Sequence, residues 1–192
     1  PAAKAALPPK SDRDDPIAEA ALVQYRKRIN GDHYVVLALL QDAEIPEVRA
    51  RGREAKRELE ALRTRALSTE QKAQLETAMK KIEASVETLG TAQSRLAYDA
   101  LRGNFKGVAR CIAAGLTVTE IDAVRATFLQ SHTGAEARAH VKFLSGNAFE
   151  TNHQGPQALA QYEEALTLDP LNLRYQQRYL ALKRRSPQFV KS

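Results

Sequence analysis

The stretch from Ala139 to Pro170 constrains the fold more than any other part of the sequence. Its small and aromatic residues recur at spacings that place them on the facing sides of two helices, which meet around Gln154 and Gly155: Gly146, Phe149, Ala158, Tyr162, Ala165 and Pro170. Small residues let two helices approach closely, and aromatic rings fill the groove between them. Proline cannot continue a helix, so Pro170 marks the end of the second one. The stretch therefore predicts a tightly packed helical hairpin.

This series of residues resembles the tetratricopeptide repeat, a helix-turn-helix unit of about 34 residues. Ser145 stands where the repeat has a large apolar residue. One repeat cannot bury its faces alone, so neighbouring helices must cover it. The resemblance implies a groove for a protein partner, and we expect Lys142, Asn147 and Gln154 to bind that partner's backbone. Self-association through the closing helix, with Tyr175 and Tyr179, is a competing use.

The composition favours an all-α protein. The chain is 43% hydrophobic but only 6% aromatic, without Trp. Ala, Leu, Glu, Arg, Lys and Gln dominate and β-branched residues are sparse, which favours helices over strands. We expect five segments: a linker over 1–15, a helical bundle over 16–103, a connecting helical hairpin over 104–134, a repeat unit with its closing helix over 135–185, and a tail over 186–192.

The segment 30–103 resembles the J domain of the DnaJ co-chaperones. The landmarks are Asp32-His33-Tyr34 followed by Leu37, a basic second helix, a long third helix, and the run from Leu89 to Asp99, which ends in Tyr-Asp. The family carries a His-Pro-Asp triplet after the second helix, and this triplet triggers ATP hydrolysis in a DnaK-type chaperone. Here Glu60-Ala61-Leu62 stands at that place, and no His-Pro-Asp occurs in the chain. The resemblance implies a degenerate J-like fold that has lost the trigger.

The predicted second helix presents a basic flank formed by Arg49, Arg53, Lys56 and Arg57. In J domains this face meets the chaperone ATPase, so the resemblance implies a partner-binding surface. The competing interpretations are a remnant of that surface and a solvated face, since acids such as Glu54 and Glu58 lie within helical reach.

No pattern in the chain supports catalysis or a bound cofactor. The four histidines, His33, His132, His140 and His153, share no ligand spacing, so we expect no metal. No nucleophile elbow, phosphate loop or dinucleotide fingerprint occurs. Cys111 is the single cysteine. It cannot form an intramolecular disulfide, and its apolar surroundings indicate a small buried side chain in a protein of a reducing compartment.

The net charge of +6 permits contact with nucleic acid or an anionic surface. Basic and acidic residues are interleaved, however, so nucleic acid is the less favoured partner. No apolar run reaches the length of about twenty residues that a membrane helix needs. We therefore predict a cytoplasmic protein, and because the sequence begins with Pro1 we interpret it as a piece of a longer chain.

Together these observations predict a non-enzymatic interaction or scaffold module without cofactors. It would hold protein partners, associate with itself, or relay the state of an upstream domain in a bacterial regulatory protein. Two alternatives stay open: a true co-chaperone of a DnaK-type ATPase, and a nucleic-acid or anionic-surface binder that uses the basic second helix.

Overall fold

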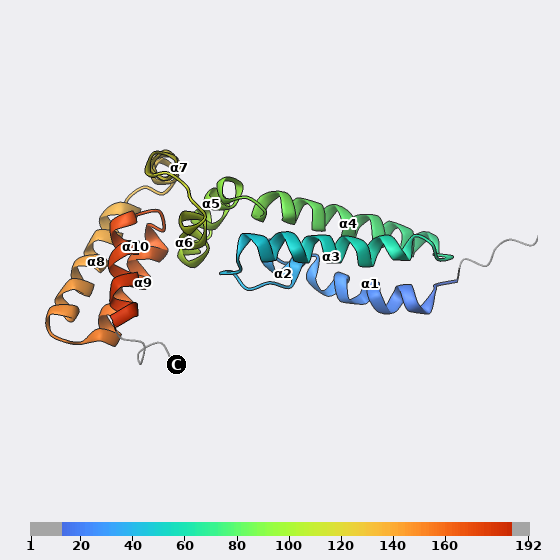
Figure 1. Ribbon diagram of the computed structural model, residues 1–192, viewed down its shortest axis with the longest axis horizontal. Helices are drawn as coiled ribbons and strands as arrows, with labels where there is room; N and C mark the ends of the chain where they lie inside the picture. The colour runs from blue at the N-terminus through green and yellow to red at the C-terminus, as the bar shows by residue number, and fades with distance from the viewer. Residues whose placement is uncertain (1–12, 186–192) are drawn as a thin grey trace, which may run out of the picture. The chain divides into compact units, whose positions relative to one another are not determined.

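A computed structural model describes residues 13–185, and within this range all regular secondary structure is helical, without strands (Figure 1). The all-α prediction is confirmed. The predicted tail and all but residues 13–15 of the predicted linker lie outside the described residues. The helices of the described part are α1 (Pro16–Arg28), α2 (His33–Leu37), α3 (Ile45–Leu62), α4 (Thr69–Leu89), α5 (Ala92–Leu101), α6 (Phe105–Ala113), α7 (Val118–Ser131), α8 (Ala135–Thr151), α9 (Gly155–Leu168) and α10 (Leu173–Arg185).

Several helix ends form where the sequence predicts them. The Asp15 carboxylate accepts hydrogen bonds from the first free backbone N–H groups of α1, and Pro16 follows it. Thr117 and Glu120 form the predicted capping box at the start of α7. After α6 the chain turns through Gly115 with a φ of 100°, a left-handed conformation that glycine adopts without strain. Local chemistry thus sets these boundaries.

The chain divides into two compact units, and helices α3 and α4 supply residues to both. Within the described residues, the first unit comprises 13–39 with Ala50–Val86, and the second comprises Leu40–Arg49 with 87–185. Helix α5 belongs to the second unit, so the segment predicted over 16–103 contributes to both. The predicted domain boundaries stay predictions.

In the first unit, the parts of α3 and α4 that belong to it run alongside each other (Figure 1). Lys56 forms an ion pair with Glu83 across the two helices, and Arg63 forms one with Glu76. The core is aliphatic with two tyrosines, and its buried members are Ala18, Leu22, Tyr25, Tyr34, Val36, Leu37, Ala55, Leu59, Leu62, Leu67, Leu75, Ala78, Met79 and Ile82.

In the second unit, α5, α6 and α7 surround one apolar cluster that contains Cys111. Cys111 is buried as predicted, and burial raises the pKa of its thiol to about 12. Beside this cluster, the fully buried Arg95 donates to the Asp99 carboxylate and to the backbone oxygens of Gln41 and Ala43. Asp99 also accepts from Asn104. This network ties the loop before α3 to α5, and it leaves the buried charge paired, as burial requires.

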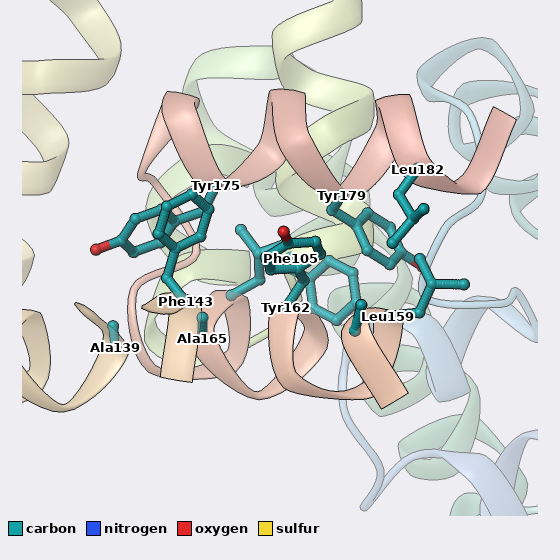
Figure 2. Packing of buried hydrophobic residues seen from close by; sticks show 11 residues of the cluster. Phe105, Ala139, Phe143, Leu159, Tyr162, Ala165, Tyr175, Tyr179 and Leu182 are labelled. Carbon is teal, nitrogen blue, oxygen red and sulfur yellow. The ribbon is translucent and has the colours of Figure 1, made fainter. Parts of the chain in front are cut away.

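A second apolar cluster in the same unit joins α6 to α8, α9 and α10. Tyr175, Tyr179 and Leu182 extend from α10 towards the α8–α9 hairpin, with Phe105 of α6 between the rings (Figure 2). Helix α10 thus covers a face that the hairpin alone would leave exposed, which is the packing that a single helical repeat requires.

Candidate functional site

The α8–α9 hairpin is closed by a direct contact between Gly146 and the Tyr162 ring. A Cβ atom added at Gly146 would lie 2.5 Å from the ring carbon Cε1. Tyr162 is fully buried, and its hydroxyl oxygen lies 2.8 Å from Asn147 Oδ1 and 2.7 Å from Glu150 Oε2, so its single proton is shared between two acceptors. Burial raises the pKa of Tyr162, so the hydroxyl stays protonated and serves as a donor. The ring of Tyr162 therefore belongs to the core, while its hydroxyl positions two polar groups of α8.

Aromatic contacts fix α10 against α8 and α6. Tyr175 stacks on Phe143, with ring centroids 4.4 Å apart and an interplanar angle of 20°. Tyr179 packs edge-on against Phe105, with centroids 5.4 Å apart, and its hydroxyl donates to Glu163 at 2.8 Å. Offset and edge-on geometries are the favourable arrangements of aromatic pairs. These contacts fix the position of α10 relative to α8 and α6.

Between α8 and α10 lies an open groove of about 510 Å³. Its size falls within the range of about 300–1,000 Å³ that is common for ligand sites. Its lining is mostly polar: Phe143 and Asn147 from α8, and Arg174, Gln177, Arg178 and Ala181 from α10. The Arg174 guanidinium lies over the Phe143 ring, 5.2 Å from its centroid. The lining thus contains one aromatic ring, which the Arg174 guanidinium covers, and both of its cations come from α10.

One carboxylate stands among the cations of this region. Glu150 accepts from Arg178 Nε at 2.9 Å and from Arg185 Nη2 at 3.3 Å. The Glu150 side chain is only 13% exposed, whereas those of Arg178 and Arg185 are 46% and 61% exposed. Hydrogen bonding with Tyr162 raises the pKa of Arg178. For Arg174, no ion pair occurs within residues 13–185.

The structure places the three predicted groove residues differently from one another. Asn147 lines the groove, and its Oδ1 is held by Tyr162. Lys142 forms an ion pair with Glu164 of α9, with 2.6 Å between Nζ and Oε2, and does not line the groove. Gln154 is the exposed N-cap residue of α9 and also lies away from the groove lining. Their role in partner binding stays a prediction.

Sequence reasoning missed the α10 wall. Arg174, Gln177, Arg178 and Ala181 follow one another at helical spacing on one stripe, beside the buried stripe of Tyr175, Tyr179 and Leu182. Two stripes on one helix, one apolar and one basic, were the signal that could have revealed the wall. Glu150 carried no such signal, because only the folded hairpin brings it to the basic end of α10.

The basic flank of α3 is divided between the two compact units. Arg53, Lys56 and Arg57 belong to the first unit, whereas Arg49 belongs to the second and donates to the backbone oxygen of Gly90 at 2.6 Å. Lys56 pairs with Glu60 and Glu83. Arg53 and Arg57 are exposed and form no ion pair with any residue from 13 to 185. Of the four cations, Arg49 and Lys56 therefore form polar contacts, whereas Arg53 and Arg57 form no ion pair among the described residues.

Within the described residues, no cluster of three or more His, Cys, Asp or Glu side chains is arranged to hold a metal. Three histidines have polar neighbours other than a metal: His132 Nδ1 lies 2.9 Å from the Phe128 oxygen, His33 Nδ1 lies 3.0 Å from Ser85 Oγ, and His140 Nδ1 lies 3.3 Å from the Tyr175 hydroxyl. Nor does any helix between residues 13 and 185 combine the length and apolar character of a membrane span.

No protein-family model matches the chain, and no solved structure matches it. The chain is 41% identical over 179 residues to the serine/threonine-protein kinase Pkn1 of Myxococcus xanthus. The match covers 93% of this chain but only 26% of that kinase, so the chain spans about a quarter of the relative's length.

Proposed function

We propose that this chain is a non-enzymatic protein-interaction module whose binding site is the groove between α8 and α10. The observation that carries the proposal is the groove itself: about 510 Å³, open to solvent, and built on helices that are fixed by aromatic packing. Its walls offer side-chain amides at Asn147 and Gln177 that can bind the backbone of an extended segment. A rigid scaffold with a polar groove suits recognition of a protein segment.

The resemblance to a tetratricopeptide repeat supports the same proposal. The small residues Gly146, Ala158 and Ala165 are buried where α8 and α9 meet, as such a repeat requires. The likeness of 30–103 to a degenerate J domain remains part of the proposal: a J-like fold without its trigger would hold partners rather than activate a chaperone.

The similarity to a kinase suggests a context for the module. The chain contains neither the His-Arg-Asp nor the Asp-Phe-Gly triplet of protein kinases, and no Gly-x-Gly sequence. We therefore place this chain, within the proposal, in a non-catalytic part of a kinase-like protein, where it would bring partners to the rest of the molecule. This extends the expected relay from an upstream domain.

A site-specific crosslinking experiment tests the proposal. A photoreactive amino acid replaces Gln177, which is exposed and lines the groove, in the full-length protein expressed in its native host. The control replaces Ala160, which is exposed on α9 outside the groove lining. We expect a discrete partner to be crosslinked from position 177 and not from position 160. Equal labelling from both positions, or none from 177, would contradict the proposal.

A further inference from the structure

We infer that the groove binds an acidic peptide segment, and that Glu150 competes with this segment for Arg178. The inference rests on the proposed function and names the chemistry of its partner. Its starting point is the unequal state of the two groove arginines. Among residues 13–185, Arg174 lies over the face of Phe143 and forms no ion pair, whereas Arg178 is already bound to a carboxylate of the same chain.

The guanidinium of Arg174 is available for an anion. It lies over an aromatic ring, an arrangement that orients the group without neutralising its charge. The planar guanidinium group presents N–H donors that can bind a carboxylate through two hydrogen bonds. Arg178, one turn later on α10, presents a second guanidinium group to the same groove. Two such groups one helical turn apart can bind two acidic side chains of an extended segment.

Glu150 shows which chemistry the groove residue Arg178 accepts. Its carboxylate collects hydrogen bonds from Arg178, Arg185 and Tyr162 and is only 13% exposed. A carboxylate therefore already occupies the position between these donors. A peptide carboxylate that approaches Arg178 must share or displace Glu150, so Glu150 lowers the affinity for acidic segments and sets how many acidic residues a partner needs.

The lining favours a peptide over single-stranded nucleic acid. Binding of unpaired bases relies on exposed aromatic faces on which the bases stack. The one aromatic ring of the groove, Phe143, is buried, with Tyr175 stacked on it and Arg174 over it. The polar groups of the lining, two side-chain amides and two guanidinium groups, match the backbone and the carboxylates of a peptide.

Fluorescence anisotropy with a defined probe tests the inference. The probe is a fluorescein-labelled peptide of Asp, Glu and Ser, and its Asn/Gln analogue reports binding without charge. We expect Arg174→Gln and Arg178→Gln each to weaken binding of the acidic probe about five- to tenfold, because each removes a charged donor. Glu150→Gln keeps an acceptor for Tyr162 and should strengthen binding about two- to fivefold, because it removes the carboxylate that competes for Arg178, and an ion pair with a half-exposed arginine is weak.

Charge-matched variants separate a specific groove from general attraction. Arg138→Gln removes an exposed cation of α8 outside the groove lining, and Glu164→Gln removes an exposed carboxylate that pairs with Lys142. Both should change affinity less than twofold. Helical circular dichroism of every variant confirms that the fold is kept.

Three outcomes would overturn the inference. They are equal effects of the groove variants and their charge-matched controls, unchanged or weaker binding by Glu150→Gln, and tighter Arg174-dependent binding of a single-stranded DNA of equal charge. If crosslinking from position 177 succeeds while the acidic probe fails, the interaction module stands and only its assigned partner is wrong. If both experiments fail, the proposed function falls with it.

Discussion

At the scale of single residues, close packing decides which positions tolerate change. Gly146 is the clearest case, because the face of α8 that it occupies touches the Tyr162 ring directly. A methyl group there must move a ring that is fully buried and tied by its hydroxyl to Asn147 and Glu150. The residue is small for steric reasons rather than for flexibility, since it lies in the middle of a helix.

We predict that Gly146→Ala destabilises the protein. Overpacking of a core costs about 1–3 kcal/mol, whereas alanine gains about 1 kcal/mol over glycine in helix propensity. The expected net loss in the free energy of unfolding is about 1 kcal/mol, measured by urea denaturation. In a Tyr162→Ala background the same substitution should be neutral or stabilising, because the ring is gone. A loss of equal size in both backgrounds would show that the ring contact is not its cause.

At the scale of elements, ion pairs anchor helix ends to neighbouring connections. Arg125 of α7 binds the fully buried Asp169 between α9 and α10, with its Nη2 2.6 Å from Asp169 Oδ2, and it also reaches Glu136. Near the start of the described chain, the Asp15 carboxylate caps α1 and accepts a hydrogen bond from Arg65 Nε at 2.8 Å. The Gln71 side chain forms hydrogen bonds with the backbone N–H and the backbone oxygen of Asp15. Such contacts join elements that are distant in sequence, so local propensity does not reveal them.

The Asp15 contact predicts a pH dependence of stability. The hydrogen bond from Arg65 holds the pKa of Asp15 below its ordinary value of 3.8. The folded state therefore binds the proton less readily than the unfolded state, so this stabilisation is present at neutral pH and is lost as the pH falls through the folded-state pKa. Asp15→Asn keeps a capping side chain but removes the charge.

We expect the Asp15→Asn variant to be less stable than the parent protein at pH 7, and the difference to shrink between about pH 5 and pH 2. The measurement is the urea midpoint of both proteins across this range. Asp122→Asn, at an exposed position of α7, serves as the control and should track the parent. A difference that is constant with pH would mean that the Asp15 charge contributes nothing.

At the scale of the whole molecule, the question is whether the chain activates a chaperone or only binds partners. Without a His-Pro-Asp triplet, the chain lacks the residues that the J-domain family uses to trigger ATP hydrolysis, and Glu60-Ala61-Leu62 lies in the last turn of α3. We predict that the protein leaves the ATPase rate of a DnaK-type chaperone unchanged at saturating concentration. A J-domain protein that carries the triplet provides the positive control. Clear stimulation by this chain would favour the co-chaperone alternative.

Much of the fold was predictable because local rules determine helices. The caps at Asp15 and Thr117 and the hairpin around Gly155 follow from residue types and spacing alone. The groove was only partly predictable. Asn147 was identified, but the α10 wall depends on which face of α10 packs inward, and the place of Glu150 depends on contacts between helices. Such features arise from tertiary packing, to which single-sequence periodicity does not extend.

The hydroxyl of Tyr162 has a consequence for how such a protein can diversify. Its ring lies in the interior, yet its oxygen steadies both an amide at the rim of the groove and the acid that restrains Arg178. Exchange of this tyrosine for phenylalanine would free both groups without altering any outward-facing position. Selectivity for a ligand can therefore drift through hidden substitutions, and comparison of surface residues among descendants would miss the change.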